Sequence, residues 1–405
     1  MPSGKTILDR LMPPADDVMK LLSRSPASPA TAAKPDTRAA PRQLLTGVQL
    51  LFITYACVCG GPFGIEPVVR VMGPFVTLLL LCVIPLVWSL QEALMTAELS
   101  TALPEMGGFV IWLQRGLGET AAQQVGYWRV VSSVFDVASY PLLMLSYLPP
   151  SYVGEDGLSL AARWAFGTSV LFAAAALNCH GVEMVGNTSS LLCVMVLLPF
   201  SVFFAVGLPS ISPDALTTLP PAGTLRSDGL SILLWNLSYF DLAGTFASEV
   251  RDPQKVFLPA MLGALALALA AYILPLLVGV SVATDYSAWR EGYFVQIAAQ
   301  VGGSWLGAWL SITGAVCAFA ILNSILSTNS RVLVALAQLG VAPAALGVLH
   351  PTRDTPVRAT AVTVLCSSAL LLVGEWELSM SLYMLSTAAE FVALANLRTL
   401  EPELH

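Results

Sequence analysis

The apolar run at residues 45–70 reads LTGVQLLFITYACVCGGPFGIEPVVR, and the segment GGPFG interrupts it at residues 60–64. Glycine weakens a helix through its conformational freedom and proline removes a backbone donor, so this segment breaks a continuous helix. Inside a lipid bilayer, the backbone groups that a break exposes must face other protein or a water-filled cavity. We therefore predict a membrane-spanning helix that is broken for function; an ordinary proline kink is the alternative.

A second interruption is expected in the apolar run at residues 229–250. This run contains WNLSYFD at residues 235–241, so asparagine, serine and aspartate lie beside three aromatic residues in the middle of a span. Such polar residues can also serve as hydrogen-bonding contacts between membrane helices. Because Gly244 follows closely and the run opens the second half of the chain, we predict a second broken helix.

The composition indicates a membrane protein. Hydrophobic residues make up 56% of the 405 residues and charged residues only 11%, whereas a soluble domain carries about 25% charged residues. The long apolar runs that recur along the chain are typical of transmembrane helices. We predict an all-α polytopic membrane protein with about ten transmembrane helices. The runs lie roughly at residues 45–70, 74–101, 122–148, 160–178, 186–208, 229–250, 256–283, 304–330, 358–374 and 378–397, with shorter helices expected at 109–116 and within 284–303.

These runs divide into two sets of five, and each set opens with an interrupted helix. Inverted repeats of this kind hold the substrate near the bilayer midplane, between the two broken helices. No sequence identity between the halves is visible, so the repeat is inferred from the placement of the breaks. We expect a disordered cytosolic tail at residues 1–44, repeats at 45–210 and 228–397, and a short tail at 398–405.

The distribution of basic residues predicts the orientation, because cytoplasmic loops carry an excess of lysine and arginine. If the N-terminus is cytosolic, then of the 19 basic residues only Arg70, Arg163, Arg226 and Arg290 fall on the outer side. We therefore expect a cytosolic N-terminus, and we expect the plasma membrane as the location.

Several classes of protein are disfavoured by what the sequence lacks. The motifs HExxH, paired CxxC, GxSxG and GxxxxGK[ST] do not occur, so the common catalytic and nucleotide-binding constellations are missing. A net charge of −7 argues against nucleic acid as a partner. We expect no enzyme, no cofactor and no metal site; the expected partners are the lipid bilayer, a small-molecule substrate and a coupling ion.

Longer motifs resemble a known family. They are GGPFGIE at 60–66, WSLQEALMTAEL at 88–99, PEMGGF at 104–109, WNLSYFD at 235–241 and EVRDPQ at 249–254. Together they resemble the amino acid–polyamine–organocation superfamily over residues 45–397. Within it the chain is most similar to the polyamine uptake branch of plants and protists, which is related to the L-type amino acid permeases.

This resemblance implies a five-plus-five inverted-repeat fold of twelve spans, of which the last two are absent from this sequence. It also implies secondary active transport by alternating access, with the substrate held between the broken first and sixth spans. The substrate-binding residues that it implies are Gly60, Gly61, Pro62, Phe63, Gly64, Asp136, Tyr140, Trp235, Asn236, Ser238, Tyr239, Asp241 and Tyr383.

Acidic residues within the apolar runs suggest a cationic substrate. A charge at the bilayer centre costs roughly 2.5–3.5 kcal/mol on insertion scales, and almost no basic residue is expected at the same depth as these acids. Polyamines could bind to such acids and to aromatic faces by cation–π contact. We take polyamines or related organic cations as the predicted substrate. The candidates for coupling and protonation are Glu66, Glu98, Asp136, Asp241 and Glu249.

The alternatives that stay open concern the substrate and the ion. A neutral or cationic amino acid could place its carboxylate at the N-termini of the broken helices, and a non-transporting sensor or truncated fragment is a further alternative. Proton symport is predicted from the buried carboxylates. A sodium site would use backbone carbonyls near Gly60 together with Ser327 and Thr328, although hydroxyls in membranes more often bond neighbouring helices.

Overall fold

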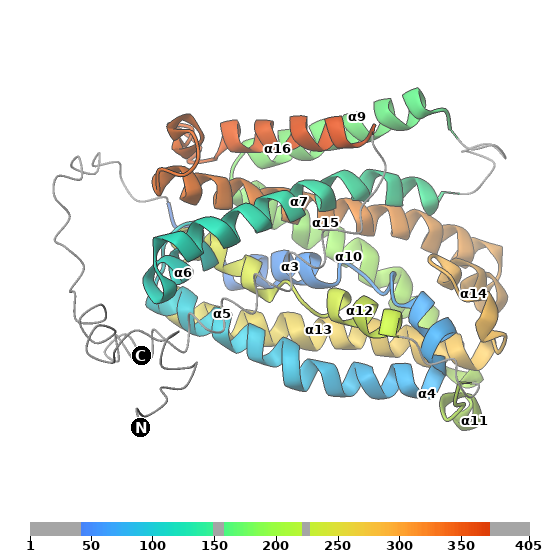
Figure 1. Cartoon of the computed structure of the whole chain (residues 1–405). Helices are drawn as coiled ribbons and strands as arrows, with labels where there is room; N and C mark the ends of the chain where they lie inside the picture. Colours follow the sequence, from blue (N-terminus) through green and yellow to red (C-terminus); the bar gives the residue numbers. More distant parts are fainter. Residues whose placement is uncertain (1–41, 149–157, 221–226, 373–405) are drawn as a thin grey trace, which may run out of the picture. The chain divides into compact units, whose positions relative to one another are not determined.

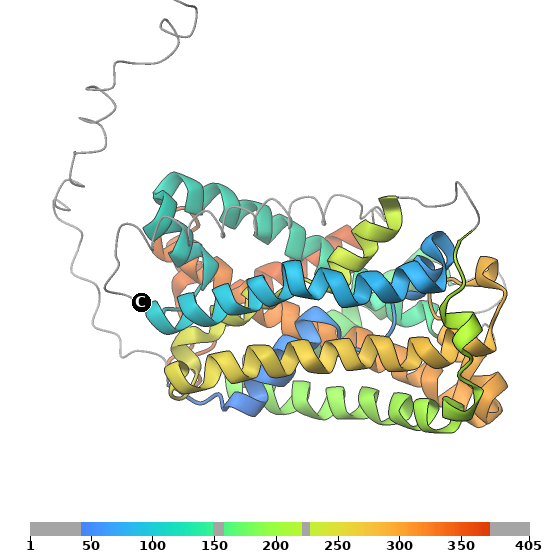
Figure 2. The ribbon, with the colours of Figure 1, turned by 90° about the horizontal axis from the view of Figure 1, so that it is seen from below.

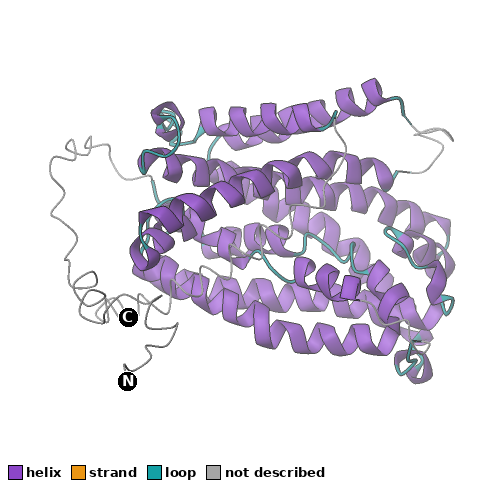
Figure 3. Cartoon of the chain, in the orientation of Figure 1, coloured by secondary structure: helices purple, strands orange, loops and turns teal. Residues whose placement is uncertain are grey.

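The computed structural model describes residues 42–148, 158–220 and 227–372, and these residues are helical, without a strand (Figures 1 and 3). All of them belong to a single unit that begins at Pro41. Within the described ranges, five helices are long and apolar enough to cross a membrane. They span Glu66–Ala102, Leu160–Cys179, Val182–Ser210, Pro253–Val282 and Ser304–Gln338.

The first span is broken where the sequence predicts it. Helix α3 (Gly47–Val58) begins at a capping box, in which Thr46 and Gln49 exchange side-chain and backbone bonds, and it ends before the glycines. Gly60 has a φ of 60° and Gly64 a φ of 95°, values that glycine adopts without the steric cost that other residues pay. The next helix, α4 (Glu66–Ile84), has its own non-helical residue at Gly73.

The sixth span is broken as well. Helix α12 (Ser227–Asn236) stops at Asn236, and the chain resumes as a 3₁₀ helix, η3 (Phe240–Glu249). Between them Tyr239 has a φ of 80°, a left-handed conformation that is unfavourable for a bulky aromatic residue. The surrounding packing must therefore hold this residue in place.

The remaining helices follow the predicted apolar runs closely. A π-helical turn, η1 (Pro85–Ser89), joins α4 to α5 (Leu90–Ala102). The others are α6 (Phe109–Leu117), α7 (Glu119–Ser146), α9 (Leu160–Cys179), α10 (Val182–Gly207), α11 (Pro213–Leu216), α13 (Pro253–Val282), α14 (Tyr293–Gly302), α15 (Ser304–Gln338) and α16 (Val357–Leu370), with short 3₁₀ turns η2 (Leu208–Ser210), η4 (Tyr286–Ala288) and η5 (Ala344–Gly347).

The broken first span lies in the middle of this arrangement. Helix α3 contacts α10, α13, α15 and η3, and the views along two directions show it enclosed by longer helices (Figures 1 and 2). Every neighbour buries apolar residues against it, and Leu50, Ile53 and Tyr55 are fully buried. The two breaks therefore lie inside the protein, where exposed backbone groups are tolerated.

Expectation and structure agree on the helical membrane fold, and they differ in detail. Among the described residues five helices meet the length and hydropathy of a full span: the broken first and sixth spans are each divided, α7 carries polar residues, α16 is short, and the tenth run lies outside the described residues. The tail at residues 1–44 lies almost wholly outside the described residues, as do the tenth run at 378–397 and the tail at 398–405. The division into two inverted repeats stays a prediction.

Candidate functional site

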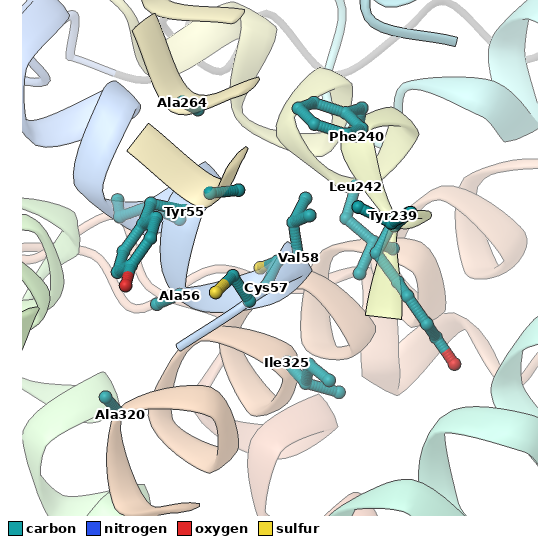
Figure 4. Packing of buried hydrophobic residues seen from close by; sticks show 14 of the residues in the cluster. Tyr55, Ala56, Cys57, Val58, Tyr239, Phe240, Leu242, Ala264, Ala320 and Ile325 are labelled. Carbon is teal, nitrogen blue, oxygen red and sulfur yellow. The ribbon is translucent and has the colours of Figure 1, made fainter. Parts of the chain in front are cut away.

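A cavity of about 240 Å³ lies between the two broken helices. We call it the central cavity. The predicted residues that line it are Phe63, Gly64, Tyr140, Trp235, Asn236 and Tyr239. In Figure 4 the last turn of α3, with Cys57 and Val58, lies beside the segment from Tyr239 to Leu242, so both breaks contribute to one space.

Aromatic rings and one aspartate form a connected group at this cavity. The Trp235 indole N–H donates to the Tyr239 hydroxyl at 3.2 Å. That hydroxyl in turn donates to the Asp136 carboxylate at 3.2 Å. Asp136 is buried on α7 and does not line the cavity, and the Arg129 Cζ lies 5.9 Å from the centre of the Tyr239 ring. An ammonium group on one of the aromatic faces that line the cavity would gain cation–π attraction.

The glycines of the first break are needed for close packing. A Cβ on Gly60 would lie 2.4 Å from the Ile321 side chain, and one on Gly61 would lie 2.7 Å from Val196. Gly60, Gly61 and Pro62 do not line the central cavity. Their contribution is to let the chain turn beside α15 and α10, which brings Phe63 and Gly64 to the cavity wall.

The two breaks are also joined to each other. The Asn236 amide donates to the Gly64 carbonyl at 3.5 Å, and the Tyr272 hydroxyl of α13 donates to the Asn236 backbone carbonyl at 3.1 Å. Ser238 lies away from the cavity: it accepts a bond from the Trp88 indole at 2.9 Å and donates to the Leu234 carbonyl at 2.6 Å. Ser238 therefore joins helices, whereas Asn236 both lines the cavity and links the breaks.

Asp241 is paired with an arginine, which corrects the expectation that buried acids have almost no basic partner. The Arg129 guanidinium of α7 donates to the Asp241 carboxylate, and both side chains are nearly or fully buried. Arg129 also stacks over the Phe109 ring, with 4.8 Å from Cζ to the ring centre. The expectation was wrong because it placed Arg129 on the inner side, whereas the fold buries it against the sixth span. Asp241 does not line the central cavity.

Glu249 is paired in the same way. Two nitrogens of Arg331 on α15 donate to its two carboxylate oxygens, at 2.5 and 3.0 Å. This fork-to-fork geometry is the strong form of the arginine–carboxylate pair. Arg331 also donates to the Ser327 hydroxyl at 2.6 Å. Ser327 is therefore already bound to a cation, and the Thr328 hydroxyl donates to the Ile325 carbonyl at 2.8 Å.

Glu66 connects the first break to a loop on the other side of the cavity. One carboxylate oxygen accepts the Gly64 N–H at 2.7 Å, and the other accepts the Gly292 N–H at 3.1 Å. The side chain is fully buried. Glu98 is only partly buried on α5, and Tyr383 lies outside the described residues.

Sequence reasoning missed several residues of the cavity. Tyr147, Glu291 and Cys317 line it, with Cys57 and Cys59 from the end of α3. Tyr147 lies at the end of a predicted span and Glu291 in a loop, so neither stands in a motif that would signal a site. Glu291 remains exposed, yet the surrounding protein raises the pKa of its carboxyl by desolvation.

Comparison with known proteins gives a consistent result. The sequence profile described as amino acid permease matches residues 45–399. The chain is 33% identical to a probable polyamine transporter of Arabidopsis thaliana over 375 residues, which cover 90% of this chain and 77% of the relative. It is 32% identical to the polyamine transporter RMV1 of Arabidopsis thaliana, covering 88% and 74%. It is 36% identical to the polyamine transporter PUT1 of Oryza sativa subsp. japonica, covering 73% and 56%.

Proposed function

Because this chain belongs to the amino acid permease family and its cavity lies between two broken helices, we propose that it imports polyamines by alternating access. Transport across a membrane is the function of the family and of this chain. The polyamine substrate, the direction of transport and a proton as coupling ion are the parts that we propose. The names of the plant relatives agree with the substrate.

The observation that carries this proposal is the chemistry of the central cavity. Its wall holds Tyr140, Tyr147, Trp235 and Tyr239 with the acid Glu291, and no lysine or arginine is among the described residues that line it. A cavity of aromatic faces and negative charge favours organic cations. An amino acid would in addition need a positive or N–H-rich site for its carboxylate.

One backbone donor that could hold such a carboxylate is already occupied. The Gly64 N–H at the first break is bonded to Glu66, so a substrate carboxylate would have to displace a buried acid. This arrangement supports the cation over a neutral amino acid. A cationic amino acid stays the second candidate, because the backbone of the break remains close to the cavity.

Proton coupling is supported by which acids are already neutralised. Asp241 and Glu249 are held in ion pairs with arginines, so neither is suited to exchange a proton in each cycle. Among the described residues no ion pair engages Glu66, which accepts only amide N–H groups. We therefore propose Glu66 as the residue that exchanges the coupled proton; Glu98 is less buried.

Sodium coupling is less compatible with these contacts. The predicted hydroxyl site includes Ser327, and Arg331 already donates to its oxygen. A sodium ion at that place would have to lie against a guanidinium, and the repulsion between two cations in a buried site is large.

Uptake of labelled putrescine into proteoliposomes tests the proposal. The purified full-length chain should accumulate putrescine when the lumen is alkaline, and an inward sodium gradient should not replace the pH gradient. Glu66→Gln should remove the dependence on the pH gradient, whereas Glu119→Gln, at an exposed acid at the start of α7, should not. Accumulation of arginine or leucine without putrescine would move the chain to the amino acid alternative.

A further inference from the structure

A second cavity, of about 520 Å³, adjoins the central one. We call it the side cavity. It is lined by the end of α7, the loop before α14, and the facing parts of α14 and α15. The two cavities share Tyr147 and Glu291. Glu291 thus lies at the junction, where a molecule longer than the central cavity would extend.

The position of Glu291 is fixed by its neighbour. The Gly292 N–H donates to the buried Glu66 carboxylate at 3.1 Å, which anchors the loop to the first residue of α4. Gly292 has a φ of 76°, and a Cβ there would meet the Tyr147 ring at 3.4 Å. The loop is therefore held against Tyr147, and the acid beside Gly292 is held at the boundary of the two cavities.

The acid at the junction has no ion pair among the described residues. Arg290 also lines the side cavity, but no ion pair between Arg290 and Glu291 occurs, nor does any other ion pair of Glu291 within the described ranges. Glu66 lies beside this loop, because its carboxylate accepts the Gly292 N–H at 3.1 Å. A cation placed at the junction would pair with Glu291 and would remain next to Tyr147.

We infer that Glu291 is a second ammonium subsite, which extends the substrate path from the central cavity into the side cavity and selects for the longer polyamines. This inference rests on the proposed function. One ammonium end lies against the rings of Trp235 and Tyr239, the methylene chain passes Tyr147, and a further ammonium pairs with Glu291. A triamine such as spermidine can contact both ends at once, whereas a shorter diamine has less reach.

The test compares two substrates in the same proteoliposomes. KM values for spermidine and for putrescine are measured for the wild type, for Glu291→Gln and for Asp214→Asn. Asp214 is an exposed acid of α11 that lines neither cavity, so its variant controls for loss of surface charge. We expect Glu291→Gln to raise the ratio of the spermidine KM to the putrescine KM about tenfold, and Asp214→Asn to leave the ratio as in the wild type.

The outcomes separate the two proposals. If the wild type transports both putrescine and spermidine, but Glu291→Gln changes the ratio of their KM values less than twofold, the subsite is overturned. The proposed function is then left intact. A wild type that transports neither polyamine overturns both. Glu291→Lys is a second test of the same site. It should raise the ratio of the spermidine KM to the putrescine KM further than Glu291→Gln does, and an unchanged ratio would count against the subsite.

Discussion

Two regions around the broken helices are held together by different chemistry. We call one the arginine end: it holds the pairs Arg129–Asp241 and Arg331–Glu249, where η3 meets α7 and α15. The other is the aromatic end, where the Phe63 ring packs on Tyr147 at 4.7 Å and on Phe200 at 5.1 Å between ring centres.

The arginine end is reinforced by the backbone. The N–H groups of Leu44 and Leu45 both donate to the Glu249 carbonyl at 2.9 Å, and the Arg251 N–H donates to the Leu45 carbonyl at 2.9 Å. The chain entering the first span is thus tied to the end of the sixth. At the aromatic end the Glu66 carboxylate connects Gly64 and Gly292, and the Ser311 hydroxyl donates to the Tyr147 carbonyl at 2.5 Å.

This difference indicates which end opens with less work. Buried ion pairs and backbone hydrogen bonds are directional. Removing one partner of a buried ion pair leaves the other charge desolvated and unpaired. Ring contacts are worth about 0.5–1.5 kcal/mol each beyond the area they bury, and they tolerate sliding. We therefore expect the aromatic end to move first, and the arginine end to separate as a unit.

The largest effect is expected at Arg331. The substitution Arg331→Met leaves Glu249 buried without its partner. This should lower the free energy of unfolding by about 3–5 kcal/mol and abolish uptake. The double variant Arg331→Met/Glu249→Leu should recover most of the stability but not the transport. Thermal unfolding of the purified protein measures the stability of the variants, and the uptake assay measures their transport. A single variant as stable as the wild type would show that the pair does not hold this end closed.

The next effect is expected at Tyr147. Tyr147→Ala removes the ring that separates the two cavities and contacts Phe63, so putrescine affinity should fall by about 2 kcal/mol, or about thirtyfold. Tyr147→Phe keeps the ring and should behave nearly as the wild type. Competition binding with labelled putrescine measures the affinity of both variants. Equal losses in both variants would assign the effect to the hydroxyl and contradict the aromatic-end interpretation.

A smaller effect is expected at Tyr239. Tyr239→Phe removes the bond to Asp136 and the acceptor for Trp235, at a cost of about 1 kcal/mol, which corresponds to about a fivefold rise in the putrescine KM. The matched control is Tyr286→Phe, whose hydroxyl donates to the Val280 carbonyl at 3.2 Å away from the central cavity. The same KM change in both variants would remove Tyr239 from the substrate path.

The smallest effect is expected at the exposed pair Arg115–Glu105, in which the two side chains are 45% and 49% exposed and 3.1 Å apart. Arg115→Gln should change stability by less than about 1 kcal/mol, because solvent screens such a pair. The same thermal unfolding experiment applies. A loss as large as that of Arg331→Met would mean that burial does not explain the difference between the two arginines.

The sequence alone determined the helices and the two breaks. The run at 74–101 corresponds to α4 beyond Gly73 and its continuation to Ala102, and the loop at 284–303 contains α14, as expected. Apolar length and the position of glycine and proline are local properties, so they can be read without knowing the neighbours. Five residues of the two motifs, Phe63, Gly64, Trp235, Asn236 and Tyr239, line the central cavity, because the breaks themselves form part of it.

Only the tertiary structure decided which charges are neutralised and which residues complete the cavity. Arg129 and Arg331 lie 112 and 82 residues from their partners, and no sequence pattern links such distant positions. Tyr147 and Glu291 reach the cavity because α7 and the loop before α14 meet near the first break. Hydrophobic patterning fixes which segments enter the membrane, whereas the pairing of buried charges depends on how those segments pack, and it is the packing that places Glu291 at the junction between the two cavities.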